Sequence, residues 1–163
     1  MRKVRESKHR LGRECYIGLV RANFALCIKD RKWVFVERKI VDCFVEILGE
    51  VREKHSCLNW AYTFMPDHVH FILEGKCETS DLWKTVVLFK QRTGYWFSRY
   101  KKTIEWQKDF YDDIHRGDVG LRSHIEYVLD NPVRKGLVRN WQDYPYKGSL
   151  DSDLEEIMYG TRF

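Results

Sequence analysis

The sequence predicts an α+β fold in which an antiparallel β-sheet is sandwiched with packed α-helices. Alternating apolar and polar residues at 58–64, the turn signal Pro66-Asp67 and an apolar run at 68–73 predict two strands joined as a hairpin. Apolar residues recur at helical spacing over about 38–54, and a further helix is expected to reach about residue 100. Strands and helices therefore do not alternate regularly, which argues against a doubly wound parallel sheet.

Shorter patterns predict the elements between these. Residues 15–28 are rich in aromatic and β-branched positions and indicate the first strand, whereas 106–111 indicate a short extended segment. The second helix can be capped at its start by Ser80 or Asp81.

One domain is expected to span residues 1–163, a length that can enclose a hydrophobic core. Residues 1–13 hold six basic residues against one glutamate and predict a flexible basic arm, and 84–102 hold six basic residues and no acid. Residues 150–163 hold four acids against one arginine and form an acidic C-terminal tail. Two basic segments in a chain of net charge +5 indicate a polyanionic partner, although solvated helix faces would look the same.

Five scattered cysteines, never spaced as Cys-x-x-Cys, argue against a zinc knuckle and against a disulfide framework. They are expected to be small buried residues in a reducing cytoplasm. No long uninterrupted apolar stretch marks a membrane span or a signal peptide, so a cytoplasmic protein with no membrane partner is expected.

His68 and His70 are the most informative pair in the chain. Side chains alternate along a strand, so the two imidazoles point to one face and can present two neutral nitrogen ligands to a metal ion. A His-x-His pair alone is weak evidence, because most such histidines are surface residues or are satisfied internally. A second cluster is needed to favour a metal site.

That second cluster lies on a third predicted helix, which Asp118 can cap. Its apolar face is formed by Leu121, Ile125, Val128 and Leu129. Pro132 disfavours a helical conformation at the residue before it, so this helix should end near Asn131. Tyr127 and Asn131 are four residues apart and hence neighbours on one face, away from the apolar stripe. They are a candidate nucleophile and a candidate third ligand, and the alternative is a packing tyrosine and a helix cap.

Both clusters resemble one family. The run Met-Pro-Asp-His-Val-His-Phe-Ile-Leu at 65–73 resembles the HUH motif (His, hydrophobic residue, His) of single-tyrosine transposases. Residues 124–138, with the pattern Tyr-x-x-x-Asn-Pro-Val-x-x-Gly-Leu-Val, resemble REP-associated tyrosine transposases, as do 106–112 and 143–149. One departure is Asp113, where many relatives carry a histidine.

The resemblance implies a HUH-type, ferredoxin-like sandwich that belongs to the IS200-like transposase superfamily. Such an enzyme cleaves single-stranded DNA beside a hairpin, transfers strands and so moves DNA. Tyr127 would match the nucleophile and form a 5′-phosphotyrosine, and His68, His70 and Asn131 would match the ligands of a divalent cation. This nitrogen and oxygen set suits Mg²⁺ or Mn²⁺, although zinc or cobalt could bind as well. The chain would act as a monomer or homodimer, associated with the nucleoid of a prokaryotic cell.

Basic side chains are candidate contacts to DNA phosphates, which position DNA without reading its sequence. They are Lys90, Arg92, Arg116 and Arg134. Aromatic residues that interleave with the basic helix are Trp83, Tyr95 and Trp96. An exposed ring could stack an unpaired base, but core packing is expected for at least two of the three.

Several alternatives stay open at this point. Tyr111 is a rival nucleophile, because His115 lies four residues later and the two could share a helical turn. The Asn-Pro-Val context favours Tyr127. The chain could also be a catalytically silent or domesticated hairpin-binding protein, a metal-dependent hydrolase that uses bound water, or a protein with a structural metal and no nucleic-acid role. A covalent protein–DNA adduct would distinguish the transposase from all three.

Overall fold

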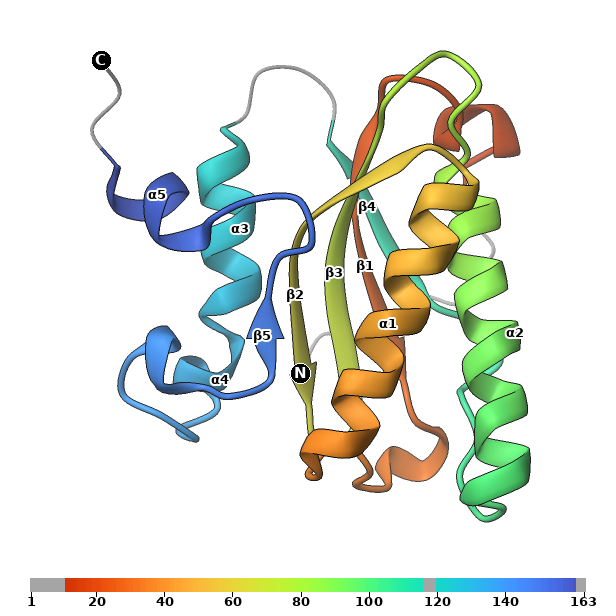
Figure 1. The fold of residues 1–163 in the computed structure, drawn as a ribbon, viewed down its shortest axis with the longest axis vertical. Helices are drawn as coiled ribbons and strands as arrows, with labels where there is room; N and C mark the ends of the chain where they lie inside the picture. The colour runs from red at the N-terminus through yellow and green to blue at the C-terminus, as the bar shows by residue number, and fades with distance from the viewer. Residues whose placement is uncertain (1–10, 116–119, 161–163) are drawn as a thin grey trace.

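A computed structural model describes residues 11–115 and 120–160 as a central sheet between two helical layers (Figure 1). The sheet order is β4-β1-β3-β2-β5, and each pairing is antiparallel. The strands are β1 (Arg21–Cys27), β2 (Cys57–Met65), β3 (His68–Gly75), β4 (Tyr111–His115) and β5 (Lys147–Gly148). The α-helices are α1 (Arg38–Lys54), α2 (Leu82–Tyr100), α3 (Leu121–Leu129), α4 (Asn131–Arg134) and α5 (Leu154–Tyr159). The predicted α+β class with an antiparallel sheet is confirmed.

The predicted hairpin is formed by β2 and β3 at the centre of the sheet. Pro66 and Asp67 make the turn, since proline cannot donate a hydrogen bond to a sheet and aspartate favours turns. Thr63 of β2 lies directly opposite His70 of β3, and Ala25 of β1 lies opposite His70 on the other side. One row of side chains therefore crosses three strands on the same face of the sheet.

The first strand is shorter than the predicted segment 15–28, because Gly18 interrupts the extended chain. Its φ of +98° lies in the left-handed region, which glycine enters without steric cost. Gly75 must also be glycine, because a Cβ there would overlap the carbonyl oxygen of Gly18. The chain before Gly18 forms a short 3₁₀ helix at Arg13–Tyr16 instead of a strand.

Arg13 belongs to the folded part of the chain. Its guanidinium lies 3.7 Å from the carboxylate of Asp81 and 5.1 Å from the ring centre of Trp83. The prediction of a flexible arm is therefore wrong at residue 13. The arm's residues 1–10 lie outside the described residues.

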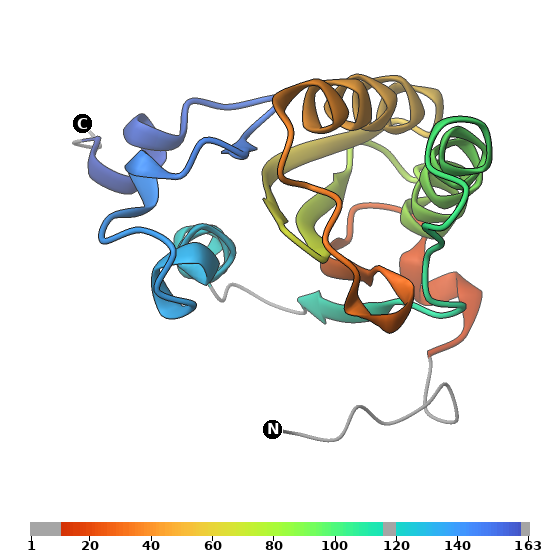
Figure 2. The ribbon, with the colours of Figure 1, turned by 90° about the horizontal axis from the view of Figure 1, so that it is seen from below.

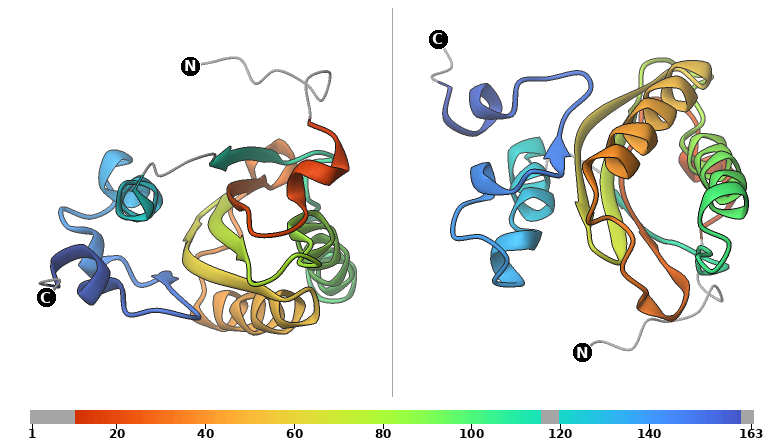
Figure 3. Two further views of the ribbon diagram at one scale, coloured as in Figure 1. Left: turned by 90° about the horizontal axis from the view of Figure 1, so that it is seen from above. Right: turned by 60° about the horizontal axis from the view of Figure 1, so that its bottom comes forward.

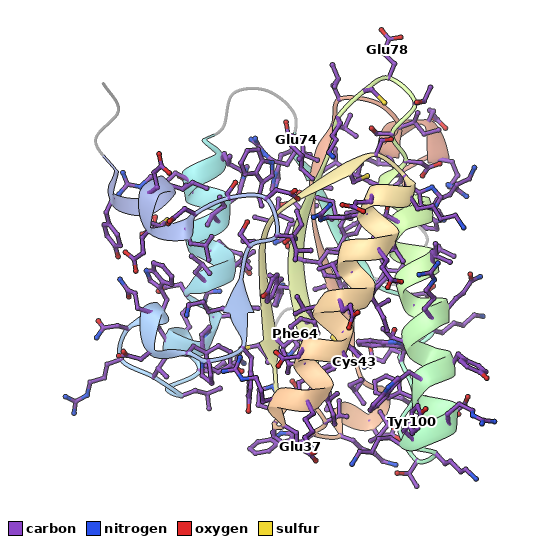
Figure 4. All side chains as sticks on the ribbon, in the orientation of Figure 1. Glu37, Cys43, Phe64, Glu74, Glu78 and Tyr100 are labelled. Atoms are coloured by element: carbon purple, nitrogen blue, oxygen red, sulfur yellow. The ribbon has the colours of Figure 1, made fainter. Side chains whose placement is uncertain are left out.

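The main core lies between the sheet and the neighbouring helices α1 and α2 (Figure 2). The bounds of α1 agree with the predicted 38–54, and Asp81 caps α2 by accepting a hydrogen bond of 2.9 Å from the backbone N–H of Lys84. Aromatic side chains dominate this core, among them Phe64, which Figure 4 labels. Trp83 and Trp96 pack against it, as expected for two of the three aromatic residues on this helix. No described helix is both long enough and apolar enough to cross a membrane.

A second, smaller core covers the opposite face of the sheet beneath α3, α4 and α5 (Figure 3). Ile125 and Val128 of α3 are fully buried against Ala61 and Ile72 of the central hairpin, which confirms the predicted apolar stripe. Residues of α5 also enter this core. The segment predicted as an acidic tail thus contains a packed helix, with its acidic side chains outward.

The edge strand β4 lies later in the chain than the predicted extended segment 106–111. Trp106 forms only an isolated bridge with Ile28, and its indole N–H donates a 2.8 Å hydrogen bond to Thr93. The strand itself contains Asp112 and Asp113, residues that strands normally disfavour. It is tolerated because an edge strand leaves carboxylates room, and the Asp112 carboxylate accepts a 2.6 Å hydrogen bond from the Tyr16 hydroxyl.

Candidate active site

The two histidines of β3 lie on the face of the sheet that α3 covers. Their ring centres are 5.0 Å apart, and they share this face because alternate residues of a strand point the same way. His68 is 7% exposed and begins the strand immediately after the Pro66-Asp67 turn. The hairpin turn therefore sets the position of both rings.

Asp67 lies between His68 and Arg31, and its carboxylate contacts both side chains. One carboxylate oxygen lies 2.6 Å from Nδ1 of His68, and the other lies 3.0 Å from Nε of Arg31. Burial lowers the pKa of His68, and the hydrogen bond to Asp67 opposes that effect. If Nδ1 donates its proton to Asp67, Nε2 keeps its lone pair for a metal, which is how second partners orient metal-binding histidines. The proline-aspartate turn before the motif could have revealed Asp67 from the sequence, but Arg31 could not be found that way.

His70 has a buried Nδ1 atom with no hydrogen-bond partner among the described residues. Burial is the main cause that lowers the pKa of His70 to about 3, and the neighbouring His68 and Arg134 add to it. The imidazole is therefore neutral, and a buried nitrogen without a partner is suited to a ligand. This ring fits the role predicted for a metal ligand.

Tyr127 and His70 line a common pocket of about 440 Å³. His70 belongs to β3 and Tyr127 to α3. The apolar face of α3 packs on the sheet, and Tyr127 lies at the edge of that face, where it is 55% exposed. The guanidinium of Arg134 lies 4.4 Å from the centre of the Tyr127 ring, and it also donates a 3.0 Å hydrogen bond to the Tyr127 carbonyl. Two of the predicted site residues thus line one space, and Arg134 lies beside one of them.

Asn131 does not share a helix with Tyr127, so the predicted placement on one continuous helical face is wrong. The chain leaves α3 at Leu129, and Asn131 begins α4. Pro132 is the reason, since it has no N–H to donate to the carbonyl of Val128 four residues earlier. The predicted cap, Asp118, lies in the part of the chain that the structure does not describe.

The carbonyl oxygen of Val128, which receives no hydrogen bond from Pro132, accepts hydrogen bonds from two side chains. The hydroxyl of Thr63 donates to Val128 O at 3.1 Å, and the amide nitrogen of Asn131 approaches the same oxygen at 3.4 Å. Because Thr63 lies opposite His70, this places Asn131, which is 7% exposed, on the histidine side of α3. Its amide oxygen remains for a metal. Among residues 11–115 and 120–160 no group of three or more His, Cys, Asp or Glu could hold a metal ion.

Tyr111 lines the same pocket as Tyr127 and is 37% exposed. It lies in the row of Ala25 and His70, because it pairs with Ala25 across β1 and β4. The hypothesis that Tyr111 and His115 share a helical turn is wrong, since both belong to a strand, where four residues span roughly 13 Å. Tyr111 nevertheless remains close enough to the pocket to be tested as a nucleophile.

His115 and His124 form a stacked pair in this pocket, with ring centres 3.2 Å apart and planes at 14°. Burial, followed by the neighbouring His124, lowers the pKa of His115 to about 4. Parallel rings this close direct their nitrogens along parallel lines, which is unsuitable for holding one metal between them. The pair was missed from the sequence because it joins β4 to α3 across the sheet.

The structure does not bring the other candidate DNA contacts to this pocket. Lys90 and Arg92 lie on α2, on the opposite face of the sheet. The ammonium of Lys90 donates to the carbonyls of Gln107 and Lys108 at 2.7 and 2.9 Å, and Arg92 pairs with Glu50 at 2.7 Å. Arg116 lies outside the described residues, so of the four only Arg134 is seen beside Tyr127.

Two known proteins are similar to this chain in sequence. A candidate REP-associated tyrosine transposase of Haemophilus influenzae is 26% identical over 151 residues, which cover 83% of this chain and 82% of that protein. The REP-associated tyrosine transposase of Escherichia coli K12 is 28% identical over 103 residues, covering 61% of this chain and 58% of its own length.

Solved structures share the fold. A REP-associated tyrosine transposase bound to a REP hairpin superposes with a TM-score of 0.72 at 21% identity, over 86% of this chain and 81% of that one. A candidate transposase from Deinococcus radiodurans R1 gives a TM-score of 0.51 at 19% identity, over 80% and 97% of the two chains. The family model described as "Transposase IS200 like" matches residues 17–128, which include the histidine strand and Tyr127. The chain therefore belongs to the IS200-like transposase family.

Proposed function

We propose that this protein cleaves single-stranded DNA beside a hairpin and transfers the cut strand through a covalent bond to Tyr127. The observation that carries the proposal is the common pocket of His70 and Tyr127. A hydroxyl nucleophile and a metal-ligating face in one accessible space are the parts that phosphodiester transfer requires.

The proposed metal ligands are His68, His70 and Asn131, with Mg²⁺ or Mn²⁺ as the cation. The bound cation would polarise the scissile phosphate and offset its developing negative charge. The fit rests on the neutral His70 ring, whose buried Nδ1 has no partner in the described part of the chain, and on the carboxylate of Asp67 beside His68. Open coordination positions would remain for the phosphate.

The chain's own residues account for the transfer itself. The phenolic oxygen of Tyr127 forms a bond to phosphorus, the bond from phosphorus to the 3′ oxygen breaks, and a proton ends on that oxygen. The products are a 5′-phosphotyrosine and a free 3′-hydroxyl. Because the phosphodiester energy is conserved in the covalent link, an incoming 3′-hydroxyl can reverse the step and join strands. Arg134, held beside Tyr127, would bind the phosphate as a charged donor.

The hairpin partner is supported by relatives. A structural neighbour is bound to a REP hairpin, and the related sequences are described as REP-associated transposases. We infer that this chain likewise recognises a palindromic hairpin with unpaired flanks. Contacts from Lys90 and Arg92 would then require DNA to reach the opposite face, and they stay predictions, as does Arg116.

A covalent adduct tests the proposal. The protein would be incubated with labelled hairpin DNA from the flank of its own gene and Mn²⁺ or Mg²⁺, then analysed on a denaturing gel. We expect an adduct that Tyr127→Phe abolishes and that Tyr111→Phe retains, the second variant being the matched control in the same pocket. Cleavage without an adduct would instead identify water as the nucleophile, and an adduct lost only in Tyr111→Phe would assign the chemistry to that residue.

A further inference from the structure

A second pocket, of about 230 Å³, adjoins His68 at the turn of the central hairpin. It shares no lining residue with the pocket of Tyr127. Its apolar walls include Trp33, Met65 and Leu137, and its charged side chains include Arg31 and Lys135. The transfer chemistry described above uses none of these five side chains directly.

Trp33 is an exposed aromatic ring on a firmly held backbone. Its side chain is 69% exposed, whereas the next two residues, Val34 and Phe35, are buried. The N–H groups of both donate to the Pro66 carbonyl, at 2.8 and 3.1 Å, which ties this segment to the hairpin turn. A tryptophan presented to solvent in this way is a stacking surface that needs no rearrangement to bind a planar ligand.

Arg31 is held in the pocket at a conformational cost. It and Asp30 have φ of +53° and +59°, values that residues other than glycine rarely adopt. The conformation is stabilised by contacts of the guanidinium to Asp67 at 3.0 Å and to the Cys27 sulfur at 2.9 Å. Strain of this kind is found where a side chain must be placed for binding or catalysis.

Lys135 supplies the second cation. It lies in the turn after α4 and lines the same pocket as His68. The pocket therefore holds two cations against the single carboxylate of Asp67. A purely apolar ligand would not use this positive charge. A nucleotide matches both features, because its base can stack on Trp33 and its phosphate can pair with the cations.

We propose that this pocket binds one unpaired nucleotide of the DNA strand, with its base stacked on Trp33 and its phosphate facing Lys135 and Arg31. The inference rests on the proposed function, since it takes the DNA at His68 as given. A base held there would fix the register of the strand and so decide which neighbouring phosphate reaches the metal ligands. Stacking tolerates every base, so the pocket would position the strand more than read its sequence.

The test measures affinity for a fluorescein-labelled hairpin oligonucleotide with unpaired flanks, by anisotropy in the presence of a chelator that prevents cleavage. Trp33→Ala is expected to weaken binding by roughly 5- to 150-fold, the range for loss of one stacked base, whereas Trp33→Phe should retain most of the affinity. Tyr159→Ala is the control, because Tyr159 is 59% exposed at the end of α5 and lines neither of the two pockets. Thermal unfolding of each variant would verify that it is folded.

Abasic substitutions distinguish a stacking role from a structural one. Each unpaired nucleotide is replaced in turn by an abasic residue, and one position should weaken wild-type binding while leaving Trp33→Ala unaffected. If Trp33→Ala is unfolded, the same scan with Trp33→Leu, which keeps an apolar side chain but has no ring, keeps the test decisive, since one abasic position should then cost less than it does in the wild type. An equal cost of every abasic position in wild type and variant would overturn the inference.

Lys135→Gln gives an independent measurement. The dependence of log affinity on log salt concentration should become shallower by roughly 0.7, the value for one phosphate contact on a single strand. Lys54→Gln, at the end of α1, should leave the slope unchanged. A Tyr127 adduct together with wild-type affinity in Trp33→Ala and a wild-type slope in Lys135→Gln would overturn the pocket alone. Failure of the wild-type protein to bind DNA would overturn the proposed function with it.

Discussion

Two acceptor groups at the site each serve two partners. The carbonyl of Val128, released by Pro132, accepts from both Thr63 and Asn131. The carboxylate of Asp67 serves His68 with one oxygen and Arg31 with the other. Each of these contacts holds a candidate site residue in place. Substitutions that remove them should therefore affect the site, although none of these groups lines the pocket of Tyr127.

Replacement of Asp67 tests this link at the residue scale. In Asp67→Asn the charged partner of His68 is lost, so the ring is less firmly oriented and a weaker donor. We expect the affinity for Mn²⁺ to fall roughly 10- to 100-fold, the usual effect of removing such a partner, as measured by calorimetry. Asp109→Asn, an exposed aspartate outside this network, should match the wild type. Unchanged affinity in Asp67→Asn would show that Asp67 does not orient a metal ligand.

Elements of the fold are joined at the site by few polar contacts. The second core holds α3 on the sheet through Ile125, Val128 and Leu129, but apolar packing alone would permit small rotations of the helix. The buried hydrogen bond from Thr63 of β2 to Val128 of α3 fixes the helix in one orientation. The position of Tyr127 relative to His70 therefore depends on this bond between a strand and a helix.

Thr63→Val removes the hydroxyl and keeps the branched shape. The buried carbonyl of Val128 then loses its better donor, so the free energy of unfolding should decrease by about 1–3 kcal/mol. Adduct formation should decrease further than stability predicts, because α3 is no longer held in register. Chemical denaturation and the adduct gel measure the two effects. Thr63→Ser, which retains the donor, is the control, and equal behaviour of the valine and serine variants would contradict the argument.

The whole molecule buries several neutral histidines around one pocket, and this affects its stability towards acid. His70 and His115 have folded-state pKa values of about 3 and about 4, well below their ordinary 6.5, chiefly because of burial. Between these values and 6.5 the unfolded chain binds protons that the folded chain does not. The contribution to stability is thus present above pH 6.5 and is lost as the pH falls towards 4 and below.

This predicts that the free energy of unfolding, measured with a chelator present, decreases as the pH is lowered from about 6.5 to about 4. His115→Asn should make the decrease less steep, by at most about 1.4 kcal/mol per pH unit for the one proton removed. Denaturant titrations at a series of pH values provide the measurement. Identical slopes for the variant and the wild type would show that His115 is not protonated on unfolding in this range.

The sequence by itself determined the local features of this protein. Helical spacing predicted α1 close to its observed bounds, a proline-aspartate turn predicted the hairpin, and strand alternation placed His68 and His70 on one face. The family followed from short motifs for the same reason, since those residues lie close together in the chain. The bounds of the first strand and of β4 were predicted less well. The left-handed conformation of Gly18 and the edge position of β4 depend on the rest of the fold, and no local pattern shows them.

Only the tertiary structure decided which distant residues meet. The contacts of Thr63 with Val128 and of Arg31 with Asp67 join segments far apart in the chain, and no local pattern encodes them. The same holds for Lys90 and Arg92, whose charge predicted a DNA contact but whose helix lies on the opposite face from the candidate site. Periodicity reports which face of an element is apolar, whereas the packing of both cores determines which elements face one another.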